Sequence, residues 1–320
     1  MKTALVTGGA GFIGSHLAEE LLLKGFKVKI IDNLSTGSLR NIKKIKTEKN
    51  CTFIRGDIMD EKLMKKVSRN VDIIFHLAAA VGVKYIIDNP LKSMITNVRG
   101  TEIALDCADK NNALFVLAST SEVYGKNEKV FFSEDDDRIE GSTNISRWSY
   151  ACAKALDEFM TFAYHREKKL KTIILRLFNT CGPRQSGRYG MVIPRFVTQA
   201  LSNETITVYG DGRQRRCFAY VGDVVNGIMK LVKSKDAIGK VFNIGTEEDK
   251  SIIELAKKIK ELTKSKSHIK LIPYNEAYKM GFEDMRYRRP DLTRIYTAVG
   301  YESKTNLEQL ILKVIDYYKK

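Results

Sequence analysis

A glycine-rich stretch near the N-terminus restricts the fold more than any other feature of the sequence. TGGAGFIG runs from Thr7 to Gly14, after an apolar segment at Thr3 to Thr7 and into an amphipathic segment at about Phe12 to Lys24. This pattern predicts a strand, a glycine turn and a helix, and Lys27 to Asp32 predicts a second strand. Such a unit offers a helix N-terminus and closely approaching backbone to a dinucleotide pyrophosphate.

The glycine spacing and the acidic residue after the second strand specify the dinucleotide further. Gly8, Gly11 and Gly14 give GxxGxxG, a variant of the GxGxxG pattern. Asp32 stands where a carboxylate accepts the ribose hydroxyls, and it would repel a 2′-phosphate. The sequence therefore predicts NAD rather than NADP as the cofactor.

Alternating strand and helix patterns continue along the chain and predict a parallel, doubly wound sheet. The further strands, each preceded by a helical pattern, are Cys51 to Arg55, Val71 to Leu77, Ala113 to Ser119 and Thr172 to Phe178.

After the last of these strands the alternation weakens, and residues 181–190 are rich in Gly, Pro and Arg, which is typical of a loop. We therefore predict an NAD-binding Rossmann domain at 1–180 and a substrate domain at 181–320. A helix near 224–232 and a strand at Val241 to Ile244 predict that the chain returns to the first domain near 221–250. The expected fold class is α/β, a Rossmann-type doubly wound sheet with a smaller, interleaved C-terminal α/β substrate domain.

Composition excludes several classes of protein. The formal net charge is +16, but the lysines alternate with apolar residues at helical spacing, and no basic groove interleaved with aromatic residues appears. We therefore predict no nucleic-acid partner. The five cysteines form no CxxC pair, so neither a disulfide framework nor a metal site is expected. No apolar run is long enough for a membrane span, and a cytoplasmic location is expected.

A tyrosine and a lysine on one helical face are the candidates for acid–base chemistry. Tyr150 and Lys154, in YACAK, are four residues apart. A neighbouring ammonium lowers the pKa of a phenol, so Tyr150 is predicted to accept a proton from an alcohol. The alternative is a surface helix that happens to carry both residues. Ser119, Thr120 and Ser121 can hydrogen-bond the same substrate oxygen, or they form an ordinary turn.

Together these features resemble the extended short-chain dehydrogenases/reductases, in the NAD-dependent group of nucleotide-sugar epimerases, dehydratases and decarboxylases. The resemblance runs nearly end to end. Its remaining motifs are GDI at Gly56 to Ile58, HLAA at His76 to Ala79, STSEVYG at Ser119 to Gly125, FNTCGPR at Phe178 to Arg184 and RRPD at Arg288 to Asp291.

The resemblance implies roles for individual residues. Tyr150 is the base, Lys154 its electrostatic partner and ribose ligand, and Thr120 or Ser121 the main hydroxyl. Asp57 matches an adenine contact or, equally well, a helix N-cap. Asn97 matches a residue near the nicotinamide. The expected cofactor-binding set is Gly8, Gly11, Phe12, Ile13, Gly14, Asp32, Asn33, Asp57, Ile58, Leu77, Ala78, Ala79, Asn97, Ser119, Tyr150 and Lys154.

The resemblance also implies a UDP-sugar substrate bound by residues of the second half of the chain. Asn179 is expected at a phosphate oxygen, Arg216 and Arg288 beside the nucleotide, and Arg184 at the sugar, although an arginine can also form a surface salt bridge. Lys84 is a hypothetical partner for a uronate carboxylate. Arg215 and Arg289 are expected to face solvent. The expected substrate-binding set is Lys84, Asn179, Arg184, Val192, Arg216 and Arg288.

Glu122 separates the possible reactions. Dehydratases of the group carry Asp then Glu at this point, whereas this chain has Ser121 then Glu122. Decarboxylases have Ser-Glu and an arginine like Arg288, and many 4-epimerases differ at the Glu122 position. However, the segment from Phe178 to Val197 resembles the substrate loop of 4-epimerases. We rank a UDP-hexose or UDP-hexuronate 4-epimerase first, UDP-glucuronate decarboxylase second and 4,6-dehydratase third.

Two further expectations concern catalysis and assembly. An NAD-sensing regulator on the same fold would tend to lose the Tyr150 and Lys154 pair, which this chain keeps. The resemblance also implies a homodimer, formed through the helices at Leu91 to Lys110 and Trp148 to Arg166.

Overall fold

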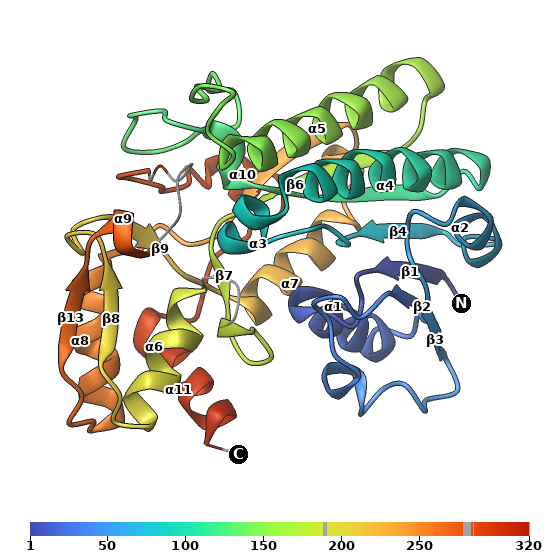
Figure 1. Ribbon diagram of the computed structural model, residues 1–320. Coiled ribbons are helices and arrows are strands. Elements are labelled where there is room, and N and C mark those ends of the chain that lie inside the picture. The colour runs from blue at the N-terminus through green and yellow to red at the C-terminus, as the bar shows by residue number, and fades with distance from the viewer. Residues whose placement is uncertain (188–190, 278–282, 284, 320) are drawn as a thin grey trace.

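A parallel sheet forms the centre of the larger lobe (Figure 1). The computed structural model describes residues 1–187, 191–277, 283 and 285–319, except for the side chains of residues 83 and 84. In this part of the chain the sheet has seven strands in the order β11-β6-β5-β4-β1-β2-β3. Their bounds are β1 (Thr3–Thr7), β2 (Lys27–Asp32), β3 (Cys51–Arg55), β4 (Ile73–His76), β5 (Leu114–Thr120), β6 (Thr172–Leu177) and β11 (Lys240–Ile244).

Helices cover both faces of this sheet, as the predicted α/β fold class requires. On one face α1 (Phe12–Leu23) packs with α7 (Val221–Leu231), and on the other α2 (Glu61–Val67), α4 (Pro90–Lys110) and α5 (Trp148–Lys168) pack together (Figure 1). Each face has its own buried apolar cluster. Because the strands are covered on both sides, their sequences are nearly continuous apolar runs.

The strand order reverses direction between β1 and β4. The chain builds β1, β2 and β3 outward in one direction and then returns to place β4 on the other side of β1. Ligands of open α/β sheets bind at such a switch point, outside the carboxyl ends of the strands. The turn after β1 and the segment after β4 meet here.

The smaller lobe has a separate apolar core. Ser251 and Asn306 each form a capping box at the start of an amphipathic helix. The elements of this lobe are α6 (Val192–Leu201), α8 (Ile252–Thr263), α11 (Leu307–Tyr318), β8 (Ile206–Tyr209) and β13 (Ile269–Ile272). Short strand pairs join β7 (Thr180–Cys181) to β10 (Ala219–Tyr220) and β9 (Arg215–Cys217) to β12 (Asp249–Ser251).

The chain returns to the larger lobe more often than the sequence indicated. Besides α7 and β11, helix α10 (Thr293–Val299) lies against this lobe. Ile295 and Tyr301 are buried in its core, and the Tyr301 hydroxyl donates a hydrogen bond to the carbonyl of Gly245 at 2.8 Å. We keep the boundary at 180/181 as a proposal, with a second return at residues 293–301.

One connection differs from the helical pattern expected before β3. The segment forms the short 3-10 helix η1 (Leu39–Ile42), which Ser38 caps, and turns up to residue 49. Ile42 and Ile45 are buried, so the apolar spacing still serves the core. Between residues 40 and 49 five basic residues accompany a single acidic one, which leaves few of the opposite-charge pairs that support an α-helix.

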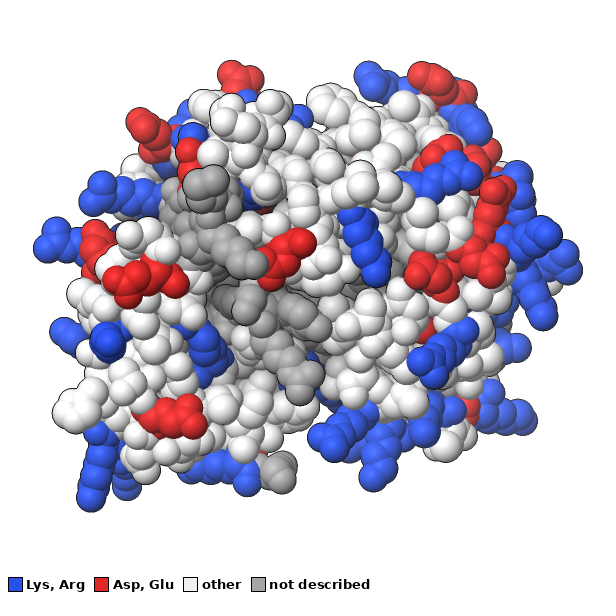
Figure 2. Space-filling model, in the orientation of Figure 1, with Lys and Arg blue, Asp and Glu red and all other residues white. Residues whose placement is uncertain are grey.

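Charge and hydropathy of the folded chain agree with an ordinary globular surface. Figure 2 shows Lys and Arg spread over the face in view, with Asp and Glu among them. Among the described helices, none combines the length and the apolar character needed to cross a bilayer.

Candidate active site

A cavity of about 410 Å³ opens at the switch point of the sheet. Its wall combines the carboxyl ends of β1, β2, β4 and β5 with the segment after β6 and with Arg288. Among the predicted residues, those that line it are Gly8, Gly11, Phe12, Ile13, Gly14, Asp32, Asn33, Asp57, Ile58, Leu77, Ala78, Ala79, Ser119, Thr120, Ser121, Glu122, Tyr150, Asn179, Arg184 and Arg288.

The glycine turn has the close backbone contacts that a dinucleotide loop needs. Gly8 has a φ of +68°, and a Cβ there would lie 2.9 Å from the backbone of Ala78. A Cβ on Gly14 would lie 2.3 Å from the carbonyl oxygen of Gly8. No side chain caps α1 at Gly11, so the backbone N–H groups of its first turn face the cavity side and suit a pyrophosphate.

The carboxylate of Asp32 stands at the end of β2, as predicted. It accepts hydrogen bonds from the backbone N–H groups of Ala10 at 3.0 Å and Leu34 at 2.8 Å. Burial raises the pKa of Asp32, and these N–H groups oppose that rise. Asn33 Nδ2 donates to Asp57 at 2.9 Å, which closes this end of the cavity. The arrangement fits the ribose and adenine of NAD.

Asn97 has a different place from the one predicted. It is buried, and its Oδ1 accepts a hydrogen bond from the backbone N–H of Ala80 at 2.7 Å. It is not among the described residues that line the cavity. Asn97 therefore holds the segment after β4 in position from behind, because its amide is occupied by the backbone of that segment.

Tyr150 and two of the three predicted hydroxyls meet at the cavity wall. Thr120 hydrogen-bonds to Tyr150 and also caps the 3-10 helix η2 (Ser121–Tyr124) by accepting from the backbone N–H of Glu122 at 3.2 Å. Ser121 begins η2 and lines the cavity. Ser119 instead donates to the buried Glu158 at 2.5 Å, so its hydroxyl is engaged inside the protein.

The expected effect of Lys154 on Tyr150 is wrong for this arrangement. Lys154 Nζ donates to Asp157 Oδ2 at 2.7 Å, and the two side chains are 2% and 0% exposed. Lys154 is absent from the described lining of the cavity. Burial, followed by the charges of Glu122 and Asp157, raises the pKa of Tyr150. The ammonium is neutralised by the carboxylate one turn later on the same helix, and this explains the difference.

Glu122 is the centre of a basic cluster. One of its oxygens lies 3.1 Å from Arg288 Nη1 and 3.5 Å from Arg147 Nη2. Burial alone would raise the pKa of Glu122, but Arg147, Arg288 and Arg216 together hold it below its usual range. Glu122 is therefore a carboxylate at neutral pH. Arg288 Nη2 also donates to Asn179 Oδ1 at 2.5 Å.

The remaining substrate residues divide into three groups. Arg184 lines the cavity, but its guanidinium is held by Glu19 at 2.7 Å and Ser15 at 3.2 Å, both on α1, rather than left free for a sugar. Val192 is partly buried and packs against the core of the smaller lobe, and its neighbour Met191 lines the cavity instead. The side chain of Lys84 lies outside the described part of the structure.

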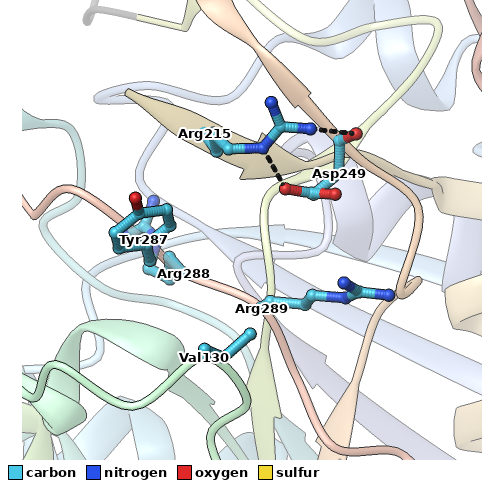
Figure 3. Close-up of a pocket in the computed structure, with 6 residues that line it drawn as sticks. All are labelled: Val130, Arg215, Asp249, Tyr287, Arg288 and Arg289. Carbon is cyan, nitrogen blue, oxygen red and sulfur yellow. Dashed lines mark hydrogen bonds and ion pairs between the residues drawn. The ribbon is translucent and has the colours of Figure 1, made fainter. Parts of the chain in front are cut away.

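A smaller pocket of about 300 Å³ adjoins the cavity and shares Arg288 with it. Figure 3 shows the guanidinium of Arg215 paired with Asp249 across the β9 and β12 strands. The guanidinium of Arg289 lies 4.2 Å from the ring centroid of Phe131. Arg215 and Arg289 were expected to face solvent. The Arg215 side chain is 38% exposed and pairs with Asp249, Arg289 lies over Phe131, and both residues line this pocket.

Sequence reasoning missed two residues that contact the predicted catalytic groups. Arg147 lies three residues before Tyr150, and Asp157 lies three residues after Lys154. The i, i+3 spacing on one helix could have found Asp157 beside Lys154. Arg147 contacts Glu122, which lies 25 residues away along the chain, so helical spacing gives no signal for it. No cluster of three or more His, Cys, Asp or Glu side chains in the described residues has the arrangement of a metal site.

Comparison with known proteins identifies the family of this chain. The family model for GDP-mannose 4,6 dehydratase matches residues 5–314. A UDP-N-acetyl-alpha-D-glucosaminuronate decarboxylase of Bacillus cytotoxicus is 41% identical over 319 residues, which cover 99% of this chain and 98% of that protein. UDP-glucuronic acid decarboxylase 1 of Danio rerio is 37% identical over 321 residues, which cover 100% of this chain and 73% of that protein.

A solved structure extends the similarity to the fold. The UDP-glucuronic acid 4-epimerase of Bacillus cereus, in complex with UDP-glucuronic acid and NAD, has a TM-score of 0.89 and 29% sequence identity, with 99% of each chain covered. The seven-stranded sheet and the flanking helices correspond to this architecture. This chain belongs to the family of the GDP-mannose 4,6 dehydratase model and, within the extended short-chain dehydrogenases/reductases, to the NAD-dependent enzymes that modify nucleotide sugars.

Proposed function

We propose that this enzyme is an NAD-dependent decarboxylase of a UDP-hexuronate. The observation that carries the proposal is the cluster at Glu122, where the guanidinium groups of Arg147, Arg288 and Arg216 act on a single carboxylate. Positive charge in excess beside a cavity favours an anionic substrate. A uronate adds its own carboxylate to the diphosphate that every UDP-sugar carries.

The chemistry needs an oxidation at C4 of the sugar before the carboxylate can leave. Tyr150 would accept the proton of the C4 hydroxyl, and Thr120 would hydrogen-bond the same oxygen. The hydrogen bond with Thr120 and the charge of Arg288 favour the phenolate, against the burial that raises the pKa of Tyr150. When bound, NAD would supply the hydride acceptor for C4 and would later return the hydride. The residues of the dinucleotide half, from Gly8 to Asp57, would hold it.

The 4-keto uronate that results is a β-keto acid. Its C5–C6 bond breaks, carbon dioxide leaves, and the electron pair moves toward the C4 oxygen, which Tyr150 and Thr120 stabilise by hydrogen bonding. C5 then takes a proton, and reduction at C4 completes a UDP-pentose. Arg288, which lines the cavity, would orient the carboxylate before it leaves, since a guanidinium fork matches its two oxygens.

The names of the relatives support this reaction over the epimerase that the sequence ranked first. The two curated relatives described above are decarboxylases, one of UDP-glucuronate and one of its N-acetylated amino-sugar counterpart. Dehydration remains third, because Ser121 occupies the position of the Asp that would serve as proton donor.

A UDP-uronate 4-epimerase is the second candidate. The similarity to the Bacillus cereus enzyme favours it, as does the loop that begins at Phe178. Epimerisation uses the same C4 oxidation, and the ketone then takes the hydride on its other face. The two candidates differ in the fate of C6, so the identity of the product separates them.

We also propose where the nucleotide lies. Asn179 and Arg288 are joined by a hydrogen bond at the edge of the cavity, and Arg288 continues into the smaller pocket with Arg215 and Arg289 (Figure 3). Guanidinium groups bind phosphate oxygens well. The diphosphate would lie along this line, with the sugar toward Tyr150.

The family resemblance and the surface of two helices support a homodimer. α4 and α5 lie side by side in Figure 1, and each exposes large apolar side chains. Leu91 and Ile95 of α4 are 67% and 49% exposed, and Leu156 and Phe159 of α5 are 46% and 59% exposed. A second copy of the chain packed on these helices would bury them.

The test is product analysis by proton NMR after incubation with NAD and, in separate reactions, UDP-glucuronate, UDP-N-acetylglucosaminuronate and UDP-glucose. A UDP-pentose or its N-acetylamino counterpart, with carbon dioxide released, is expected from one of the uronates. A C4-inverted uronate that keeps C6 would replace the proposal with the epimerase. The Tyr150→Phe variant is the control, since it should form neither product.

A further inference from the structure

The buried face of α5 carries a carboxylate for which the proposed reaction has no use. Asp157 accepts a hydrogen bond from Lys154 Nζ at 2.7 Å, and it is fully buried. A buried ion pair contributes little net stability, because desolvation of both charges offsets their attraction. Net stability therefore does not explain this ion pair, and we consider instead where Asp157 holds the ammonium of Lys154.

A line of polar side chains continues from Asp157 to the glycine turn. Thr101 of α4 lies beside Asp157 and lowers the pKa of its carboxyl. His76 Nε2 lies 3.2 Å from the hydroxyl of Thr101, and His76 Nδ1 lies 3.0 Å from that of Thr7. The Thr7 hydroxyl in turn accepts a hydrogen bond from the backbone N–H of Ala78 at 3.2 Å.

One consistent pattern of donors and acceptors runs along this line. Because the Thr7 oxygen accepts from Ala78, its proton can go to Nδ1 of His76. Burial lowers the pKa of His76 to about 3, so the ring is neutral and carries its own proton on Nε2. That proton is donated to Thr101, whose hydroxyl is then directed to Asp157. Asp157 thus accepts hydrogen bonds from Lys154 and from Thr101. Both stabilise its ionised form, whereas burial raises its pKa.

We propose that Asp157 is a positioning residue that holds the ammonium of Lys154 beneath the cavity, so that a dinucleotide must compete with this carboxylate for the lysine. Tyr150 lines the cavity and Lys154 does not, within the part of the chain that the structure describes. The inference rests on the proposed role of Tyr150 as the base. It is independent of whether C6 of the sugar is lost or kept.

Several charged groups besides Asp157 affect the ionisation of Tyr150. Glu122 of η2 and Asp157 of α5 oppose ionisation of the phenol, and Arg288 favours it. Arg147 at the start of α5 is directed to Glu122, and His76 of β4 is neutral. Removing the charge of Asp157 therefore favours the phenolate and frees Lys154 for the ribose hydroxyls.

The test compares Asp157→Asn with the wild-type enzyme in two measurements. In a fluorescence titration with NADH, without sugar, Asp157→Asn should bind about fivefold more tightly, the equivalent of one hydrogen bond. In the pH profile of kcat, its acid limb should move down by about one pH unit, as expected when one nearby charge is removed. Asp157→Glu restores the carboxylate and should return both values toward the wild type.

Asp106→Asn is the matched control. Asp106 is also a carboxylate between α4 and α5, where it accepts a hydrogen bond from the Tyr164 hydroxyl at 2.6 Å, but it does not contact Lys154. Its loss should leave NADH binding and the acid limb unchanged. Equal shifts in Asp106→Asn, or NADH binding that is unchanged or weaker in a folded Asp157→Asn protein, would overturn the proposal.

A second variant protects the test against misfolding. Asp157→Ser removes the carboxylate but keeps a hydroxyl that can accept a hydrogen bond from Lys154, and it should give the same two shifts. The NADH titration needs no turnover, so it tests the role of Asp157 even if the enzyme does not catalyse the proposed decarboxylation.

Discussion

At the level of single residues, we predict that Asp32 controls which dinucleotide the cavity accepts. Its carboxylate is held by the N–H groups of Ala10 and Leu34, where the ribose hydroxyls of NAD would meet it. Asp32→Asn keeps one accepting oxygen but loses the charge, so affinity for NAD should fall about tenfold and affinity for NADP should rise. Calorimetric titration with both dinucleotides measures this change. Asp57→Asn serves as the control and should leave the preference for NAD intact.

Glu122 gives a prediction about pH. Its folded pKa is depressed below the ordinary 4.5, so its stabilising contribution is complete above that value and is lost as the pH falls through the lowered pKa. Glu122→Gln leaves the arginines without their carboxylate and should lower the free energy of unfolding at pH 7 by about 2–4 kcal/mol. The difference from the wild type should shrink below about pH 4.5 in denaturant titrations. A constant difference from pH 7 to pH 3.5 would show that the charge of Glu122 is not the cause.

The sequence identified the residues that lie inside known motifs, but it did not always identify the side chains that contact them. The glycines and Asp32 lie in the cavity because backbone geometry leaves few alternatives at those positions. Lys154 was assigned to Tyr150 from its spacing and from the family resemblance. Two carboxylates on α5 lie within helical reach of Lys154, and both are buried. Asp157 pairs with Lys154, while Glu158 pairs with Arg176 of the neighbouring strand β6 at 2.7 Å.

At the level of elements, α4 and α5 carry the predicted dimer contact. Phe159→Glu places a charge in the centre of the exposed apolar face, and a charge cannot be buried there without a partner. The variant should therefore be a monomer in light scattering at concentrations where the wild type is a dimer. Leu23→Glu changes an equally apolar exposed residue on α1, outside these helices, and should leave the assembly unchanged. A monomeric wild type would contradict the dimer itself.

Element positions followed the sequence where apolar periodicity and caps agreed. The strands of the sheet lie within two residues of their expected bounds, and Ser251 and Asn306 cap α8 and α11. The segment before β3 failed this test. Its apolar spacing was typical of a helix, but its charged residues are nearly all basic. A shorter 3-10 helix and turns are enough to bury Ile42 and Ile45.

At the level of the whole molecule, NAD should stabilise the fold as a unit. The cavity is built from the ends of several strands, and ligand that binds only the folded state stabilises it by mass action, by about 2.7 kcal/mol at a hundredfold excess over Kd. Differential scanning fluorimetry should show a rise in Tm with NAD. Gly14→Ala brings a Cβ into the backbone of Gly8 and should lose most of this rise. An equal rise with AMP alone would show that the nicotinamide half contributes nothing.

The two-lobe architecture could be predicted in outline but not in its connections. Strand and helix alternation indicates the sheet, and its weakening after β6 indicates the second lobe. Nothing in the local pattern near Ile295 distinguishes a helix of the smaller lobe from one that packs against α7, because both require the same apolar stripe.

The return of α10 to the larger lobe has a consequence for synthesis on the ribosome. Ile295 and Tyr301 complete a core whose first strand is Thr3–Thr7, so this core cannot close until nearly the whole chain has left the exit tunnel. The core of the smaller lobe also waits for Leu307 and the helix that follows, which are made after Tyr301. Emergence of the segment from α10 to α11, rather than folding of one lobe after the other, should therefore be the event that makes this enzyme protease-resistant.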